Sequence, residues 1–199
     1  MYRKYIKRIL DVFVSVLAFP FFCIIFIIVA PLIKLTDGGT VFYKAKRRGI
    51  YGSTFEMYKF RSMKMDAPDL RNKDNSTYNA PDDPRITKIG KILRKTSIDE
   101  TAQLLNVLKG NMSIIGPRPI TIDKPIEEYD EKRKKRLTVK PGITGYQQAF
   151  YRNSIEQEKK FELDAEYAEK VSFIFDAKII LKTIQTVLLR KNIYNANND

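Results

Sequence analysis

The fold is organised by one long apolar run near the N-terminus, Val12-Phe-Val-Ser-Val-Leu-Ala-Phe-Pro-Phe-Phe-Cys-Ile-Ile-Phe-Ile-Ile-Val-Ala-Pro-Leu-Ile33. It carries no charge, and only Ser15, Pro20 and Pro31 fall outside the apolar set. As a straight helix it would rise roughly 33 Å, at about 1.5 Å per residue, which is enough to cross a bilayer. Because no small-x-small cleavage site follows the run, it predicts a retained membrane anchor rather than a cleaved signal peptide.

Two features of this anchor argue against a straight helix across the membrane. Pro20 lies in its middle, where a proline removes a backbone hydrogen bond and kinks a helix. Basic side chains flank both ends of the run: Arg3, Lys4, Lys7 and Arg8 before it, and Lys34, Lys44, Lys46, Arg47 and Arg48 after it. Since positive charge stays on the cytoplasmic side, a straight span would carry one basic flank across. A helix that bends at Pro20 and returns to the same face avoids this cost. Proline and charge alone leave both topologies open.

The composition limits the partners and the kinds of catalytic or metal site that the chain can have. The chain has 199 residues, the size of one domain, and its 36 Lys and Arg against 23 Asp and Glu give a net charge of +13. This excess favours an anionic partner such as a membrane surface, nucleic acid or a phosphorylated substrate. The sequence contains no His, which excludes His-based triads and zinc sites, and the lone Cys23 excludes an internal disulfide. Any acid–base or nucleophilic catalysis must therefore use carboxylates, Lys, Tyr or hydroxyl groups.

The polar middle of the chain begins with a predicted β-hairpin. Residues 40–46 and 54–61 are β-branched and aromatic with partial alternation, and Gly49 and Gly52 mark the turn between them. Residues 66–84 are rich in Asp, Asn, Pro and Ser, so we expect them to form a surface loop.

Two amphipathic helices are predicted from apolar residues at three- and four-residue spacing. Residues 85–95 place isoleucine and leucine on one side and lysine on another. That lysine face either meets anionic headgroups or a diphosphate, or is an ordinary solvated face. Residues 172–190, with Ser172 as the expected cap, are too polar to span a membrane. They either lie in the membrane interface or pack as a core helix, which is the default for such periodicity.

An acidic pair opens another predicted helix, residues 97–110. Ser97 and Glu100 fit a capping box, in which Glu100 reaches back to the Ser97 amide, and this explains the acidic residues structurally. The alternative interpretation is chemical. A helix N-terminus favours anions, so Asp99 would stay ionised and attack phosphorus to give an acyl phosphate. The neighbouring Glu100 would then ligate a hard divalent cation.

Two proline-rich turns follow this pair. Gly116-Pro117-Arg118-Pro119 places a guanidinium between two prolines, whose fixed φ angles lower the entropy that Arg118 loses on binding a phosphate or carboxylate. Pro141-Gly142-Ile143-Thr144-Gly145 is a tight turn whose amides we expect to be free for an anion. Each turn is also typical of ordinary loops.

Taken in order, these segments closely resemble the monotopic (small) phosphoglycosyl transferases, also called the bacterial sugar transferase family. The similarity runs from the N-terminal basic patch to about Asp176, and the order of the motifs makes it specific. The matching stretches are Tyr58-Lys-Phe-Arg-Ser-Met63, Thr87-Lys-Ile-Gly-Lys-Ile-Leu-Arg94, Ser97-Ile-Asp-Glu100, Gln103-Leu-Leu-Asn-Val-Leu-Lys-Gly110, Met112-Ser-Ile-Ile-Gly-Pro-Arg-Pro119 and Pro141-Gly-Ile-Thr-Gly145.

The resemblance implies a reaction and a set of site residues. Members transfer a phosphosugar from a nucleotide diphosphate sugar, usually a UDP-sugar, to a polyprenol phosphate and release the nucleoside monophosphate. Asp99 matches the nucleophile that carries the phosphosugar, and Glu100 matches the ligand of Mg²⁺. Because such a mechanism is covalent, ping-pong kinetics are expected. The expected substrate-binding residues are Arg94, Arg118, Pro141, Gly142, Gly145 and Arg152.

The resemblance also implies an architecture: an α+β fold, mostly α, with a small β-hairpin and amphipathic interfacial helices. Residues 1–35 are expected to form a re-entrant membrane helix. Residues 36–199 are expected to form a catalytic domain on the cytoplasmic face of the inner membrane. The expected partners are a UDP-sugar, polyprenol (undecaprenyl) phosphate and membrane lipids, with no nucleic acid.

The sequence departs from the family pattern in three places. Thr101-Ala102-Gln103 lacks the proline that usually follows the acidic pair by two positions, and Asn111 replaces a common acidic residue. Residues 146–152 differ from the small, Gly-containing pattern that is often seen, so they do not indicate which sugar is used.

Two functions other than phosphosugar transfer are also compatible with the sequence. One is a membrane-tethered basic scaffold or nucleic-acid-binding protein without catalysis, which the net charge of +13 would suit. The other is a lipid-phosphate phosphatase or hydrolase, in which water accepts the phosphoryl group.

Overall fold

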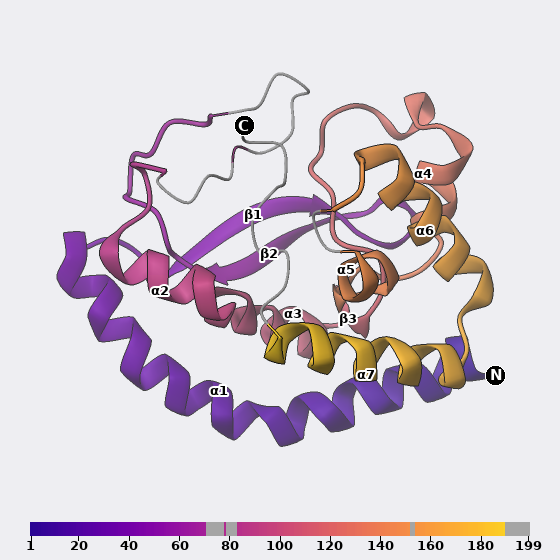
Figure 1. The fold of residues 1–199 in the computed structure, drawn as a ribbon, viewed down its shortest axis with the longest axis horizontal. Helices are drawn as coiled ribbons and strands as arrows, with labels where there is room; N and C mark the ends of the chain where they lie inside the picture. Colours follow the sequence, from indigo (N-terminus) through magenta and orange to yellow (C-terminus); the bar gives the residue numbers. More distant parts are fainter. Residues whose placement is uncertain (71–77, 79–82, 152–153, 190–199) are drawn as a thin grey trace.

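A computed structural model describes residues 1–70, 78, 83–151 and 154–189. Helices predominate around a small antiparallel hairpin, which confirms the predicted fold class (Figure 1). The strands are β1 (Phe42–Arg48), β2 (Thr54–Phe60), β3 (Ser113–Ile115) and β4 (Gly142–Thr144). The α-helices are α1 (Lys7–Asp37), α2 (Lys88–Thr96), α3 (Leu104–Lys109), α4 (Glu131–Arg136), α5 (Tyr146–Phe150), α6 (Gln157–Lys170) and α7 (Phe173–Leu188). A π-helical turn, Tyr2–Ile6, precedes α1, and the 3₁₀ turns are η2 (Ile50–Gly52), η3 (Ile98–Gln103) and η4 (Ile126–Glu128).

The apolar N-terminal run forms a single bowed helix, α1, that extends two residues beyond the predicted boundary at residue 35. The helix curves along one side of the molecule (Figure 1), with its inner face packed against the core through Phe22, Val29 and Ile33. Pro20 lies near the midpoint of the helix, where its missing N–H favours a bend. Large apolar side chains such as Phe21 and Ile27 are exposed along the bow. Of the helices that the structure describes, only this one is long and apolar enough to cross a membrane.

Polar bonds fasten both ends of α1 to the rest of the molecule. Near the start, Lys7 Nζ lies 2.6 Å from Asp176 Oδ2, and Arg8 donates to two backbone carbonyls at the end of α3. At the other end, Arg61 donates to both carboxylate oxygens of Asp37. The two ends of the apolar helix are therefore held by the same globular body.

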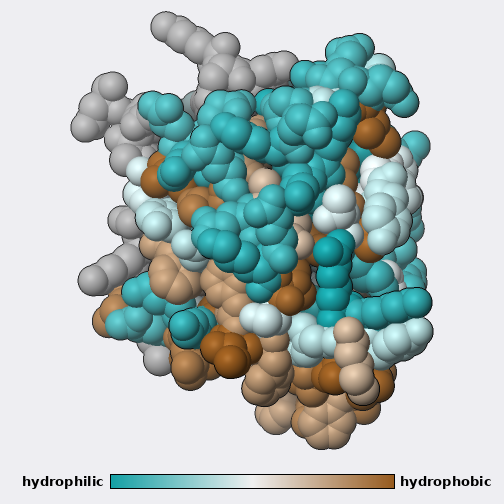
Figure 2. Space-filling model, turned by 90° about the vertical axis from the view of Figure 1, so that its right-hand side faces the viewer, coloured by the Kyte–Doolittle hydropathy of each residue, from teal (hydrophilic) through white to brown (hydrophobic). Residues whose placement is uncertain are grey.

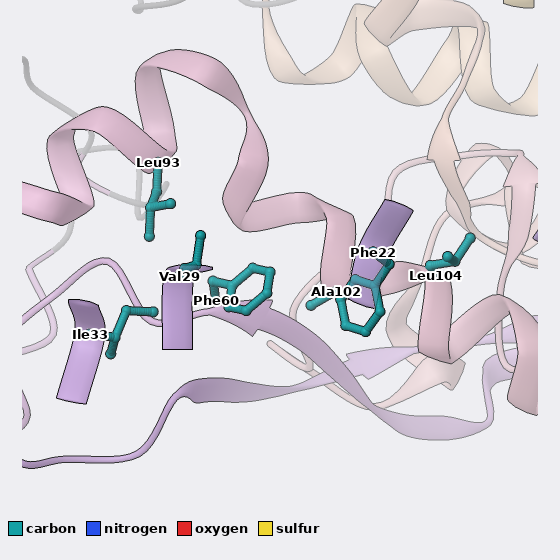
Figure 3. Packing of buried hydrophobic residues seen from close by; sticks show 7 residues of the cluster. All are labelled: Phe22, Val29, Ile33, Phe60, Leu93, Ala102 and Leu104. Carbon is teal, nitrogen blue, oxygen red and sulfur yellow. The ribbon is translucent and has the colours of Figure 1, made fainter. Parts of the chain in front are cut away.

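An apolar core joins α1 to the elements that carry the acidic pair. Phe60 lies between side chains of α1 and Ala102 of η3, as Figure 3 shows. Phe60 and Leu93 are 1 % exposed, so this contact excludes water almost completely. The buried members of the cluster are Phe22, Val29, Ile33, Phe60, Leu93, Ala102 and Leu104. The inner face of the anchor is thus part of the core beneath the site, and burial of this kind is the main source of its stability.

The predicted hairpin is confirmed, with β1 antiparallel to β2 and Lys46 opposite Glu56. A second pairing, between β3 and β4, is parallel and brings the two proline-rich turns side by side. The backbones approach so closely there that a Cβ on Gly142 would lie 2.1 Å from the Gly116 nitrogen. Gly142 is therefore required by this close approach.

The C-terminal helix α7 packs against the core, as one of the two interpretations of its sequence predicts. Its start is capped as expected, because the Ser172 hydroxyl accepts from the amide of Phe175 at 3.3 Å. Ile179 is buried, yet Ile174 and Leu181 are largely exposed. The helix packs through one side and presents apolar side chains on the other.

Gly90 determines how closely α2 approaches the segment after β2. A Cβ at this position would lie 1.9 Å from the Ser62 carbonyl oxygen, which is backbone and has little room to move. We predict that Gly90→Ala lowers the free energy of unfolding by about 1–3 kcal/mol, because the added methyl group overpacks this contact. Thermal denaturation in detergent tests this. Lys91→Ala, one residue along on the exposed side, is the control, and equal melting temperatures for the two variants would contradict the prediction.

Candidate active site

A sharp joint between α2 and η3 positions the acidic pair. α2 ends at Thr96 and η3 begins at Ile98, so Ser97 alone connects them, in the left-handed conformation with φ of 58°. A residue other than glycine is strained there, and such strain tends to occur at functional sites. The joint brings Arg94, in the last turn of α2, close enough to Asp99 to act on its charge.

The predicted capping box is wrong. The side chain of Ser97 makes no capping hydrogen bond, and the carboxylate of Glu100 does not reach back to the Ser97 amide. Instead Glu100 bonds to Lys59, which lies on β2. The predicted helix over 97–110 is also divided into η3 and α3, although Gly110 ends it with φ of 86°, as expected.

Glu100 is held as a carboxylate by two cations. Its Oε1 atom lies 2.7 Å from Lys59 Nζ and 3.3 Å from Arg118 Nη2. Burial alone would raise the pKa of Glu100, but the charges of Lys59 and Arg118 outweigh it and lower the pKa to about 2. Glu100 is therefore ionised at any physiological pH.

The pKa of Asp99 is shifted in the opposite direction. The residue is only 8 % exposed, and burial raises the pKa of its carboxyl to about 6 against the opposing charges of Lys59, Arg94 and Arg118. Within the part of the chain that the structure describes, neither carboxyl oxygen makes a hydrogen bond or ion pair. Two adjacent carboxyls with pKa values pushed apart are typical of a site in which each has its own task.

The structure brings two of the predicted arginines to this pair. Arg94 donates from Nε to Ser62 Oγ at 2.9 Å, and Arg118 contacts Glu100. The backbone carbonyl of Arg118 accepts from Arg136, whose buried ion pair with Asp164 fixes that segment. The guanidinium of Arg118 is itself half-exposed, so it can meet a substrate.

The turn from Pro141 to Gly145 packs against the segment that carries Arg118. The amide of Gly142 donates to the Pro117 carbonyl at 2.9 Å, so the prediction that it is free for an anion is wrong. A Cβ on Gly145 would meet the Gly116 carbonyl oxygen at 2.1 Å, and Pro141 lines the same small cavity as Arg118. These residues support the Arg118 segment. The remaining predicted ligand, Arg152, lies outside the described residues.

Sequence reasoning assigned no role to Lys59. It contributes a charge to both acidic residues and a direct bond to one of them. The available signal was its position in Tyr58-Lys-Phe-Arg-Ser-Met63, a stretch that matches the family but contains several polar candidates.

The donor atoms suit a magnesium ion that is shared with a substrate. Among residues 1–70, 78, 83–151 and 154–189, no group of three or more Cys, Asp or Glu side chains is placed to hold a metal by itself. Mg²⁺ is commonly bound by one or two carboxylates, with waters and substrate phosphates completing the shell. The described bonds of Glu100 use only Oε1, so Oε2 and the adjacent Asp99 carboxyl remain for such an ion.

Comparison with known proteins gives a consistent picture. The family model described as Bacterial sugar transferase matches residues 2–190. A Bacillus subtilis protein named "Uncharacterized sugar transferase EpsL" is 40 % identical over 193 residues, covering 97 % of this chain and 92 % of that protein.

Two longer relatives have named activities. The Salmonella typhimurium "Undecaprenyl-phosphate galactose phosphotransferase" is 36 % identical, with 96 % of this chain and 42 % of that protein covered. The Escherichia coli "UDP-glucose:undecaprenyl-phosphate glucose-1-phosphate transferase" is 35 % identical, with the same two shares covered. This chain therefore spans less than half the length of these two enzymes.

The raised pKa of Asp99 predicts that replacing this residue stabilises the fold, by an amount that depends on pH. The folded state binds the proton of the Asp99 carboxyl more tightly than the unfolded state does. The contribution of this proton to the free energy of unfolding is therefore complete below about pH 4 and is lost as the pH rises through about 6. Without added metal, Asp99→Asn should therefore raise the free energy of unfolding above pH 6 by about 1–3 kcal/mol, with the difference vanishing near pH 4. Denaturation at several pH values measures this.

The control is Asp66→Asn, which changes an exposed carboxylate and should have little effect at any pH. If Asp99→Asn instead melted below the wild type at pH 7.5, the carboxylate would be part of the structural support.

Proposed function

Because the chain belongs to the bacterial sugar transferase family and is a phosphoglycosyl transferase, we propose that it transfers a phosphosugar from a UDP-sugar to undecaprenyl phosphate through a covalent intermediate on Asp99. The observation that carries this proposal is the state of Asp99. Its carboxyl is largely buried beside Glu100, burial raises its pKa to about 6, and groups perturbed in this way are concentrated at functional sites. Its neighbours supply the positive charge that a phosphorylated substrate needs.

The proposed reaction has two displacements at one phosphorus atom. An oxygen of Asp99 bonds to the phosphorus next to the sugar, the bond to the bridging oxygen breaks, and UMP leaves with the electron pair. An oxygen of undecaprenyl phosphate then bonds to the same phosphorus. The acyl-phosphate bond breaks, the Asp99 carboxylate is restored, and the sugar is joined to the lipid through a diphosphate.

The charged residues around Asp99 have distinct tasks in this scheme. Lys59 and Arg118 hold Glu100, and together with Arg94 they place positive charge where the transferred phosphoryl group must lie. Fixed charges of this kind stabilise a developing negative charge without reorganisation. Glu100, with Asp99 beside it, would hold Mg²⁺, which when bound neutralises diphosphate charge.

We place this reaction at the cytoplasmic face of the inner membrane, with α1 re-entrant. Support comes from the bonds that tie Arg8 and Asp37, at opposite ends of α1, to the same body. Hydrophobic residues gather at the bottom of the molecule in Figure 2, at the level where α1 lies in Figure 1. The exposed apolar side of α7 would rest in the same interface. Such a position suits a water-soluble donor and an isoprenoid acceptor whose phosphate lies at headgroup depth.

The function is tested by incubating the purified protein with Mg²⁺, undecaprenyl phosphate and a panel of UDP-sugars that begins with UDP-glucose and UDP-galactose. We expect stoichiometric UMP and lipid-linked sugar phosphate from at least one donor. Asp99→Asn should lower the rate roughly 10³-fold or more, because the nucleophile is lost. Glu100→Gln should require a much higher Mg²⁺ concentration, whereas Asp66→Asn should behave as the wild type.

Other outcomes would favour other functions. Release of UMP or sugar phosphate over many turnovers, in the absence of any lipid acceptor, would indicate a hydrolase. The absence of UMP with every donor, together with tight, salt-sensitive binding of DNA, would favour the non-enzymatic alternative. An unchanged Mg²⁺ titration in Glu100→Gln would remove that residue from the metal site.

The re-entrant topology predicts that both flanks of α1 react from the same side of the membrane. In a Cys23→Ser background, the thiols introduced by Lys4→Cys and by Lys64→Cys should resist an impermeant maleimide in intact cells and react after the cytoplasmic side is opened. Both native side chains are exposed, so the introduced thiols are accessible to the reagent. Labelling of the Lys4→Cys thiol in intact cells would establish a single span instead.

A further inference from the structure

Asn106 is a buried polar residue that the proposed reaction does not use. It lies on α3 with no exposed surface. Its Oδ1 accepts from the amide of Tyr58 at 2.9 Å, and its Nδ2 donates to the carbonyl of Glu56 at 2.6 Å. A side-chain amide has one end that accepts and one that donates, and here both ends are bonded to strand β2.

These two bonds complete an open edge of the hairpin. β1 pairs with β2 along one edge, with Lys46 opposite Glu56 and Lys44 opposite Tyr58. Because the hairpin has two strands, no strand among the described residues lies beside the other edge of β2. The amide of Asn106 takes the place that a third strand would fill, and it fixes α3 at one register along β2.

The register matters because the next residue on β2 is Lys59. Lys59 Nζ reaches Glu100 Oε1 at 2.7 Å, and Glu100 lies on η3, which continues directly into α3 at Leu104. Two connections therefore join β2 to the continuous segment formed by η3 and α3: the ion pair at the site and the Asn106 amide further along. From this geometry we infer that Asn106 is a positioning residue that sets Lys59 against Glu100, an inference that rests on the proposed function.

Packing alone would not supply this register. Val107, the next residue on α3, is also fully buried, and it belongs to an apolar cluster with Phe55 and Met57 of β2. Apolar contact holds the two elements together but is non-directional, so it tolerates a small shift along the strand. An apolar residue in place of Asn106 would also leave the Tyr58 amide and the Glu56 carbonyl without their partner, which favours such a shift.

A double-mutant cycle on the full-length protein, read by UMP release with the active UDP-sugar, tests the inference. Asn106→Leu should lower kcat roughly 10- to 100-fold, the size of effect that an ångström-scale misplacement produces, while KM for the donor changes less than about threefold. Lys59→Gln removes the group that Asn106 is inferred to place. In that background Asn106→Leu should cost less than about threefold, because residues acting through one contact are not additive.

Val107→Ala is the matched control, since it weakens the same helix without touching the bonds to β2. It should cost the same factor with and without Lys59→Gln. Equal losses from Asn106→Leu in both backgrounds, or a loss confined to KM, would overturn the positioning role. A wild-type protein that releases no UMP would contradict the proposed function itself, which is a distinct result.

If Asn106→Leu does not fold, Asn106→Ser is carried through the same cycle, because its hydroxyl is small and polar enough to be accommodated. Should Asn106→Ser fold and show the same non-additivity with Lys59→Gln, the positioning role stands. Failure of both variants to fold would overturn the inference, because the amide would then be required by the whole core rather than by the site.

Discussion

The ion pair between Lys59 and Glu100 is the interaction on which the organisation of the site depends. It connects β2 to η3, and the same lysine lowers the pKa of Glu100 and partly offsets the burial of Asp99. Glu100 is held by Lys59 and Arg118, whereas Asp99 is bonded to neither of them. The division of labour between Asp99 and Glu100 thus follows from how one charge is shared, since burial alone would raise the pKa of both groups.

The anchor is part of the catalytic fold rather than an appendage. Its inner face packs against Phe60, one residue beyond Lys59, and Arg8 bonds to the end of α3. Because Ala102 of η3 lies in the same cluster, a movement of α1 would shift both β2 and η3, the two elements that the ion pair joins. In the proposed reaction, this coupling would link the depth of α1 in the membrane to the position of Asp99.

The features that the sequence predicts well are those set by local pattern. The apolar run over 12–33, the hairpin and Gly110 as a helix end all follow from periodicity and turn chemistry, and the family motifs bring Asp99, Glu100, Arg94 and Arg118 together as candidates. The misses concern contacts between distant segments. Lys59 is 41 residues from Glu100, so no local pattern reveals their bond. Ser97 ends α2 in the left-handed conformation and its amide donates to the Arg94 carbonyl, so it is not available for the predicted capping box. The Gly142 amide is likewise taken by Pro117 through the parallel pairing of β3 with β4.

The central claim is that an oxygen of Asp99 becomes bonded to phosphorus during turnover. Intact-protein mass spectrometry after mixing with the active UDP-sugar alone, in the absence of lipid acceptor, tests it most directly. The account predicts an added mass equal to one sugar phosphate, mapped by peptide analysis to Asp99, lost on addition of undecaprenyl phosphate and absent from Asp99→Asn. An adduct on another residue, or efficient passage of label from donor to lipid with no species on the polypeptide, would contradict it.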